Sequence, residues 1–147
     1  MQKWPEVGDI YLVRFYGSGS TQSGRRPGMI FQNNYGNTKS PNVVVLPLTS
    51  KIKKENQATH VVVRAVDSGL LTDSMIICEN PWTIPTDRIG EYLTSLPRHY
   101  LKEVAKATLL SSSIISYLTQ SELLTIYHKA IEYNAVSFVN ERGDNDV

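Results

Sequence analysis

The sequence predicts a single α+β domain, mainly β, with a small bent antiparallel sheet or barrel followed by C-terminal helices. The 147 residues match the size of one ordinary domain. Hydrophobic residues make up 41% of the chain and charged residues 20%, as in folded globular proteins. Before Pro97 the apolar segments are short and separated by turn residues, whereas after it they recur at helical spacing.

Short apolar segments predict five strands, at residues 10–15, 27–31, 43–48, 60–63 and 75–78. Pro27 would stand at the first position of its strand, where the missing N–H does least harm. The run 43–48 is almost wholly apolar, which is typical of a central strand covered on both faces. The connecting segments are predicted loops: a mobile Gly/Ser-rich one at 16–25, a polar one at 33–42 and a basic one at 51–57.

Helical spacing begins at Pro97, a residue favoured at the first position of a helix. The apolar face of this first predicted helix consists of Leu101, Val104, Ala105 and Thr108. The serines at 111–113 should end or bend it. Thr119 and Glu122 have the spacing of a capping box, which predicts the start of a second helix. Residues 141–147 are expected to fray.

Composition and missing motifs exclude several classes of protein. The net charge is only +1, so a surface that binds nucleic acid must be a local patch. Cys78 is the single cysteine and cannot form an internal disulfide; it is predicted to be a buried strand residue, not a nucleophile. Because the chain has no signal-like or membrane-spanning apolar stretch, we expect a soluble cytoplasmic protein without membrane contact.

No HExxH, paired CxxC, P-loop or GxGxxG motif is present, so neither a metal site nor a cofactor is expected. The polar residues at strand ends are the better candidates. Arg26 precedes a proline and is held extended at a strand entrance. Thr49 follows the most buried predicted strand, where rigid backbone fixes its hydroxyl.

Each candidate also has a structural explanation. Arg26 could serve in a salt bridge, and the Thr49 hydroxyl could bond to backbone at a strand end. The lysines at 51, 53 and 54 are most simply a solvated loop. His60 could be a base, although a strand-start histidine is more often satisfied locally, and His99 and His128 are expected on the helix surface. Trp82 could stack on a base, but it more often fills a packing gap or a subunit contact.

An ordered set of motifs covers about residues 7 to 110 and resembles the MazF/PemK family of toxin ribonucleases. The matching motifs are Gly8-Asp9-Ile10-Tyr11, Gln22, Gly24, Arg26-Pro27, Gln32-Asn33-Asn34-Tyr35-Gly36-Asn37, Ser40-Pro41, Pro47-Leu48-Thr49-Ser50, Asp73-Ser74, Glu79, Thr83-Ile84 and Arg88-Ile89-Gly90. The resemblance implies an SH3-like, CcdB/PemK-type fold, with the toxin domain at 1–110 and a helical extension of it at 111–147.

The same resemblance implies a homodimer that cleaves single-stranded RNA, including mRNA, and is neutralised by a cognate antitoxin. The family's catalytic residues fall on Arg26 and Thr49, and its loop glutamine falls on Gln22. Further RNA contacts are expected from Arg25, Asn33, Ser50, Lys51 and Lys53. No metal or other cofactor is implied.

RNA carries a 2′-OH that can attack the adjacent phosphate, and an arginine fork can hold the charge that develops on the phosphate oxygens. Two other functions stay open. A CcdB-like toxin would bind gyrase and cut nothing, and would not need the Arg26–Thr49 pair. A decayed relative would bind RNA without cutting it, and Asn80-Pro81-Trp82, where many members have Gln and Arg after the glutamate, motivates that alternative. Thr21 and Pro85 also depart from the family pattern.

Overall fold

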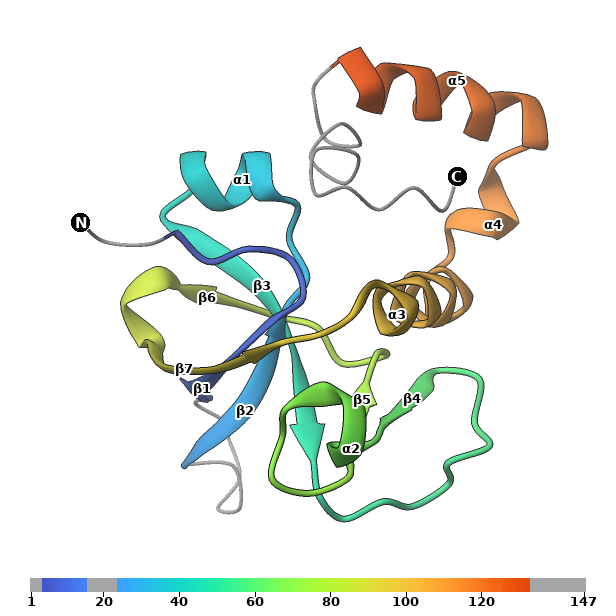
Figure 1. Ribbon diagram of the computed structural model, residues 1–147. Coiled ribbons are helices and arrows are strands. Elements are labelled where there is room, and N and C mark those ends of the chain that lie inside the picture. Colours follow the sequence, from blue (N-terminus) through green and yellow to red (C-terminus); the bar gives the residue numbers. More distant parts are fainter. Residues whose placement is uncertain (1–3, 16–23, 133–147) are drawn as a thin grey trace.

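The computed structural model describes residues 4–15 and 24–132 (Figure 1). The strands in these ranges are β1 (Asp9–Arg14), β2 (Arg25–Ile30), β3 (Asn42–Thr49), β4 (His60–Val63), β5 (Ser74–Ile77), β6 (Trp82–Pro85) and β7 (Ile89–Ser95). The helices are α1 (Asn34–Lys39), α2 (Ala65–Ser68), the 3₁₀ turn η1 (Thr86–Arg88), α3 (Arg98–Ser111), α4 (Ile114–Tyr117) and α5 (Gln120–Glu132). The predicted order of strands followed by helices is confirmed.

The apolar run predicted as a central strand becomes β3, the middle of a seven-stranded antiparallel sheet. Six of the strands follow the order β4-β5-β3-β2-β1-β7, and the seventh, β6, pairs with β3. One edge of β3 pairs with β2. Its other edge pairs with β6 near the start of β3 and with β5 near its end. Within the described ranges the outer strands β4 and β7 do not pair with each other, so the sheet is bent and open, not a closed barrel.

Two apolar clusters lie on opposite faces of the sheet, and alternate residues of β3 enter each. Leu46 and Leu48 belong to the cluster that packs under α3, whereas Val43 and Val45 belong to the cluster with Phe15. This alternation follows from the two-residue period of a strand. The prediction that both faces of this strand are covered is therefore confirmed.

The sequence missed six elements of the fold: β6, β7, α1, α2, α4 and the 3₁₀ turn η1. Strands β6 and β7 were not predicted, because β6 ends in a proline and β7 is largely exposed and contains Gly90 and Glu91. Helix α1 occupies the segment predicted as a polar loop, since the Asn33 side chain caps it by accepting the Gly36 N–H at 2.8 Å. The short α2 was missed as well.

Helix α3 packs on the sheet through a face different from the predicted one. Tyr100, Val104 and Ala107 are its buried residues, while Ala105 is exposed. The prediction placed Ala105 in the apolar face and left out Tyr100. Tyr100 can be buried because its hydroxyl forms two hydrogen bonds. That hydroxyl accepts the backbone N–H of Arg64 at 3.0 Å and donates to Asp67 at 2.6 Å. These bonds tie α3 to the end of β4 and to α2.

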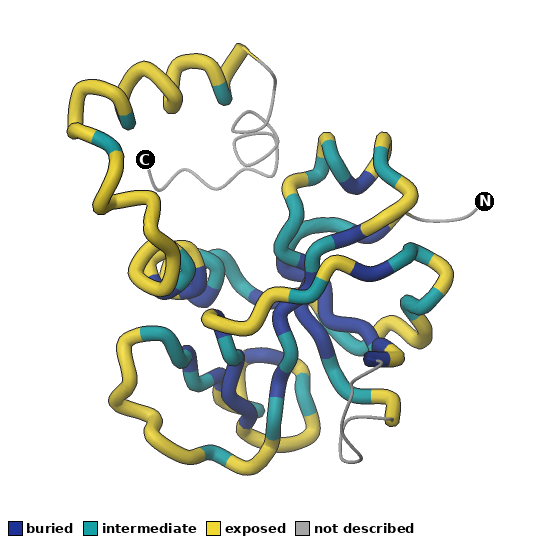
Figure 2. Tube along the Cα trace, turned by 180° about the vertical axis from the view of Figure 1, so that it is seen from behind, coloured by how far each residue is buried: buried dark blue, intermediate teal, exposed yellow. Residues whose placement is uncertain are grey.

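The last two helices project from the body of the molecule. Helix α3 ends at Ser111, within the serine-rich segment predicted to stop it, and α5 follows the predicted capping box. Thr119 Oγ1 accepts the Glu122 N–H at 3.1 Å, and Glu122 Oε1 accepts the Thr119 N–H at 3.0 Å. Both α4 and α5 are almost entirely exposed (Figure 2). Their exposed apolar side chains are Ile114, Ile115, Tyr117, Leu124, Ile126, Tyr127 and Ile131.

The structure bears on two further expectations. The predicted mobile loop at 16–25 falls mostly, and the fraying end at 141–147 entirely, outside the described residues. Among the helices of the described part of the chain, none combines the length and hydropathy needed to cross a bilayer.

Replacing Tyr100 with phenylalanine should lower the free energy of unfolding by about 1–2 kcal/mol, because the Arg64 N–H loses its partner and the Asp67 carboxylate keeps only its pair with His99. Urea denaturation measures this loss. Tyr127→Phe, on the exposed face of α5, should change it by less than about 0.5 kcal/mol. Equal effects of the two substitutions would contradict an anchoring role for Tyr100.

Candidate functional site

Arg26 and Thr49 lie toward the same end of the sheet, each two residues beyond the last β2–β3 pair, Gly28 with Pro47. Gly28 lies opposite Pro47, and in an antiparallel pair each step back along β2 moves one step forward along β3. Continuing this register by two residues would put Arg26 opposite Thr49. Residues directly opposite each other project from the same face, with Cβ atoms about 4.5–5.5 Å apart.

The same row continues across the neighbouring strands with apolar residues. Val13 of β1 is paired with Arg26, and Met75 of β5 is paired with Thr49. Val13 and Met75 are both buried, whereas Arg26 and Thr49 are only half-buried. Arg26 and Thr49 therefore both lie next to buried apolar residues of the neighbouring strands.

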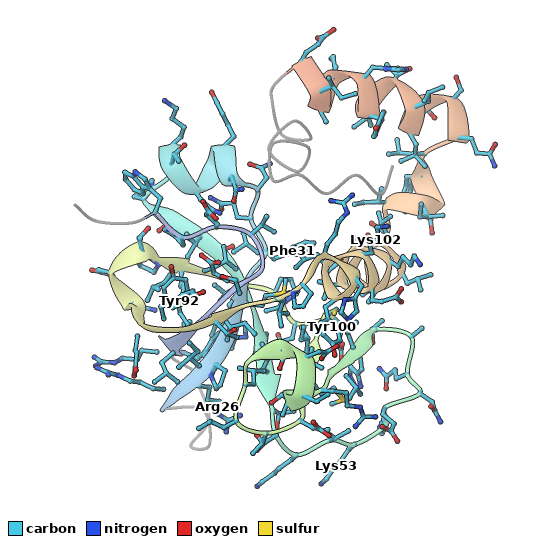
Figure 3. All side chains as sticks on the ribbon, viewed as in Figure 1. Arg26, Phe31, Lys53, Tyr92, Tyr100 and Lys102 are labelled. Atoms are coloured by element: carbon cyan, nitrogen blue, oxygen red, sulfur yellow. The ribbon has the colours of Figure 1, made fainter. Side chains whose placement is uncertain are left out.

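Arg25 and Arg26 lie next to each other in β2 but differ in their surroundings. Arg25 is exposed and is paired with Arg14 at the end of the β1–β2 hairpin. Arg26 is half-buried and is paired with the buried Val13. Because side chains alternate along a strand, the two arginines point to opposite faces of the sheet. Figure 3 shows Arg26 at the same end of the molecule as Lys53.

The Thr49 hydroxyl accepts the backbone N–H of Lys51 at 3.1 Å. This is the backbone bond expected of a hydroxyl at a strand end, so the structural explanation for Thr49 is confirmed. The bond uses an acceptor lone pair of the oxygen and leaves the O–H proton able to donate. Thr49 can therefore close the turn after β3 and also donate to a bound anion.

A lysine-rich loop, residues 51–57, follows Thr49 and Ser50 directly; we call it the lysine loop. Ser50 and the three lysines Lys51, Lys53 and Lys54 are exposed, which agrees with the expected solvated loop. Lys54 adopts a left-handed backbone, φ 52°, a conformation in which non-glycine residues are uncommon. Its carbonyl accepts the Gln57 N–H at 3.0 Å, which closes a turn.

His60 is satisfied locally, as predicted. Its Nε2 lies 2.8 Å from Glu79 Oε1, and its Nδ1 lies 3.2 Å from the carbonyl oxygen of Lys54. Burial raises the pKa of Glu79, but hydrogen bonds from its own backbone N–H, from His60 and from Thr59 outweigh burial and lower it. Glu79 therefore stays ionised at neutral pH and anchors both His60 and Thr59.

The remaining residues considered for chemistry or RNA binding are either packed in the fold or exposed on helices. Cys78 is fully buried, and burial followed by the charge of Glu79 raises the pKa of its thiol to about 12, so it packs as predicted. Trp82 packs edge-on against Phe15, with ring centroids 5.4 Å apart. His99 and His128 are exposed on helices, as expected.

One predicted RNA contact, Asn33, does not join the cluster around Arg26 and Thr49, and the position of another, Gln22, is not described. Asn33 follows the far end of β2, where its side chain caps α1. Gln22 lies outside the described residues. Conversely, sequence reasoning assigned no role to Glu79 or Thr59. Their signal in the sequence is weak, since nothing there shows that residue 79 meets residues 59 and 60.

Two further features limit what chemistry the described part of the chain can perform. An apolar groove of about 660 Å³ lies between the sheet and α3–α4, but no lysine or arginine lines it, so it is a poor phosphate site. Over residues 4–15 and 24–132, no group of three or more His, Cys, Asp or Glu side chains is arranged to hold a metal ion.

Comparison with known proteins gives a consistent match. Residues 6–111 match the family described as PemK-like, MazF-like toxin of type II toxin–antitoxin system. Endoribonuclease MazF of Staphylococcus saprophyticus is 40% identical over 101 residues, which are 68% of this chain and 84% of that protein. Endoribonuclease EndoA of Bacillus subtilis is 33% identical over 111 residues, 75% of this chain and 96% of that protein.

Solved structures match the same part of the chain. The Mycobacterium tuberculosis toxin MazF-mt6 has a TM-score of 0.60 and 25% identity, covering 70% of this chain and 94% of its own. MazF from Deinococcus radiodurans has a TM-score of 0.63 at 22% identity, covering 76% of this chain and all of its own. A mycobacterial endoribonuclease in complex with its cognate antitoxin has a TM-score of 0.61 at 22% identity, covering 73% of this chain and 93% of its own.

The lowered pKa of Glu79 predicts a specific dependence of stability on pH. Its folded-state pKa lies below the ordinary 4.5, so the carboxylate contributes stability above that value, which is lost as pH falls through the folded pKa. Glu79→Gln should therefore be less stable than the wild type at pH 7, and the difference should shrink as pH falls below 4.5. Urea unfolding across pH measures it. A difference that stays constant down to low pH would contradict this account.

Proposed function

The chain belongs to the PemK-like, MazF-like family of toxins from type II toxin–antitoxin systems, and from this premise we propose that it is a metal-independent endoribonuclease that cleaves single-stranded RNA. The proposed substrate class includes mRNA. The two relatives with the highest identity described above are both named endoribonucleases. They are matched over most of their own length, which supports carrying the activity over to this chain.

In the proposed reaction the RNA 2′-oxygen attacks the adjacent phosphorus. A bond from the 2′-oxygen to phosphorus forms, and the bond from phosphorus to the 5′-oxygen of the next nucleotide breaks. The 2′-OH loses its proton and the departing 5′-oxygen gains one, which leaves a 2′,3′-cyclic phosphate and a 5′-OH. Negative charge develops on the phosphate oxygens, so fixed donors at that position lower the barrier.

The observation that carries this proposal is the pairing of β2 with β3 up to Gly28 and Pro47, because the same register, continued by two residues, would set Arg26 opposite Thr49. The guanidinium of Arg26 stays charged and offers a planar fork of donors that matches two phosphate oxygens. The Thr49 O–H adds a donor from the neighbouring strand. We propose that both hold the phosphate in the transition state, and that Arg26 gives a proton to the leaving oxygen and regains its charge by taking up the proton that the 2′-OH releases.

The rest of the RNA would lie over the cationic surface beside this pair. Lys51 and Lys53 of the lysine loop, together with Ser50 and Arg25, are exposed near the Arg26 end of the sheet. Phosphates bound by such groups give affinity without sequence preference. Gln22 and Asn33 stay proposed contacts, Gln22 in the segment before β2 and Asn33 toward the other end of that strand.

The proposed partners are a second copy of the chain and a cognate antitoxin. Family membership supports the antitoxin, because the family consists of toxins of type II toxin–antitoxin systems. The matched part of the chain ends at residue 111, so α4 and α5 form an extension beyond it. We propose that this extension packs across the dimer or shields part of its surface, since it exposes several large apolar side chains.

Arg26→Ala should lower the rate of RNA cleavage by about 100- to 1,000-fold, because the transition state loses a fixed charged donor. The assay follows a long single-stranded RNA in EDTA with purified, antitoxin-free protein. Arg25→Ala is the matched control: it removes the same charge one residue away on the other face, and should retain most of kcat.

The outcomes of this assay separate the alternatives. Gyrase binding by a protein that cuts no RNA would favour a CcdB-like toxin. RNA binding without cleavage would favour a decayed member of the family. Equal losses from Arg25→Ala and Arg26→Ala would contradict the assignment of Arg26.

Replacing the 2′-OH by hydrogen at the cleaved nucleotide should abolish cleavage there while binding is kept, because the proposed nucleophile belongs to the RNA. A short oligonucleotide with one deoxynucleotide, compared with its all-ribose parent, makes this measurement. Cleavage of the deoxy-substituted bond at the parent rate would exclude the 2′-OH mechanism.

A further inference from the structure

We propose that His60, anchored by Glu79, is a positioning residue that holds the lysine loop in place beside the Arg26–Thr49 pair so that its ammonium groups bind the RNA backbone. This inference rests on the proposed function and deepens it. It assigns a role to a histidine and a glutamate that take no direct part in the chemistry proposed above.

Both ring nitrogens of His60 face hydrogen-bond acceptors. Nε2 lies 2.8 Å from the carboxylate of Glu79, and Nδ1 lies 3.2 Å from the carbonyl oxygen of Lys54. A neutral imidazole can donate from one nitrogen only, whereas the imidazolium donates from both. The ring therefore lies between Glu79 and the Lys54 carbonyl in the middle of the lysine loop, within hydrogen-bond distance of both. The His60 side chain is only 8% exposed and that of Glu79 is 36% exposed, so the histidine is the more shielded member of the pair.

His60 contacts the lysine loop at Lys54, the residue with the left-handed backbone. Lys54 has φ 52°, and its carbonyl accepts the Gln57 N–H at 3.0 Å as well as the His60 ring. A left-handed lysine persists when surrounding contacts hold it. The second bond to this carbonyl thus fixes the point where the loop turns, between Lys53 and the residues that lead back to β4.

A second chain of bonds runs from Glu79 to the same turn. Thr59 donates to the Glu79 carboxylate, and its hydroxyl oxygen accepts from Gln57 Nε2 at 3.1 Å. The Thr59 carbonyl in turn accepts the Cys78 N–H at 3.0 Å, which extends the pairing of β4 and β5 by one step. Glu79 is therefore attached to rigid sheet and reaches the loop by two routes.

The other end of the lysine loop is fixed at the proposed catalytic residue. The Lys51 N–H bonds to the Thr49 hydroxyl, so one end of the loop is tied to Thr49 and the other to His60. The loop's own carboxylate, Glu55, lies 4.0 Å from the Arg64 guanidinium, which partly neutralises it. The loop thereby presents mainly positive charge at the end of the sheet where Arg26 and Lys53 both lie (Figure 3).

A double-mutant cycle tests whether His60 acts through the lysines. The cycle combines His60→Gln with simultaneous replacement of Lys51, Lys53 and Lys54 by alanine, and measures KM and kcat on a short single-stranded RNA. In the wild-type background His60→Gln should raise KM about tenfold and change kcat less than about twofold. In the lysine-free background the same substitution should change KM less than about twofold, because the groups it positions are gone.

The salt dependence of KM gives an independent readout. If three lysines contact phosphates, the slope of log affinity against log salt should become shallower by about 2 when they are removed, since each single-strand contact contributes about 0.7. His60→Gln should produce part of the same change. His99→Gln, an exposed histidine on α3, is the matched control and should leave KM and the slope unchanged.

Equal effects of His60→Gln in the two backgrounds would overturn the inference, because His60 would then support the fold in general. If His60→Gln does not fold, Glu79→Gln takes its place in the same cycle, with a smaller effect expected in the same direction. Absence of RNA cleavage by the wild-type protein would instead contradict the proposed function. The wild-type measurement in the same assay distinguishes this outcome from a failure of the inference about His60.

Discussion

The pairing of β3 on both edges and its burial on both faces is the constraint on which the rest of the structure depends. Alternate residues of β3 enter the two apolar clusters, so a slip of one residue would expose each set on the wrong face. The register with β2 is fixed for the same reason. Thr49 lies one residue beyond the buried Leu48, and Arg26 lies two residues beyond the buried Gly28, so the packing of the core fixes where both residues lie along their strands.

Local arrangement, not bulk charge, makes this surface suitable for RNA. The net charge of the chain is +1, yet Arg26, Arg25 and the lysine loop gather at one end of the sheet. The loop begins beside the Thr49 hydroxyl, which accepts the Lys51 N–H, and ends before the half-buried His60, which is paired with Glu79. A cationic segment of this kind would be mobile without such attachments, because its lysines find no apolar surface to pack against.

The sequence predicted the parts of the fold that rest on local patterns. Apolar runs located five strands within two residues of their ends, and Thr119 with Glu122 marked the start of α5. It failed where long-range pairing decides the structure: β7 is a polar edge strand held by β1, and α3 turns Tyr100 inward because Arg64 and Asp67 supply partners. Arg26 and Thr49 were predicted from an ordered family resemblance. The link from Glu79 to His60 was not, since only folding joins them.

The central claim is that the fold sets positions 26 and 49 opposite each other on one face. Disulfide formation in the double variant Arg26→Cys, Thr49→Cys tests it most directly, because strand residues in register have the Cα separation of about 4.5–5.5 Å that a disulfide accepts. Cys78 does not compete, as it is fully buried and its thiol pKa is raised to about 12. The account predicts rapid cross-linking under mild oxidation, and none in Arg25→Cys, Thr49→Cys. No bridge between 26 and 49, or an equal one between 25 and 49, would contradict it.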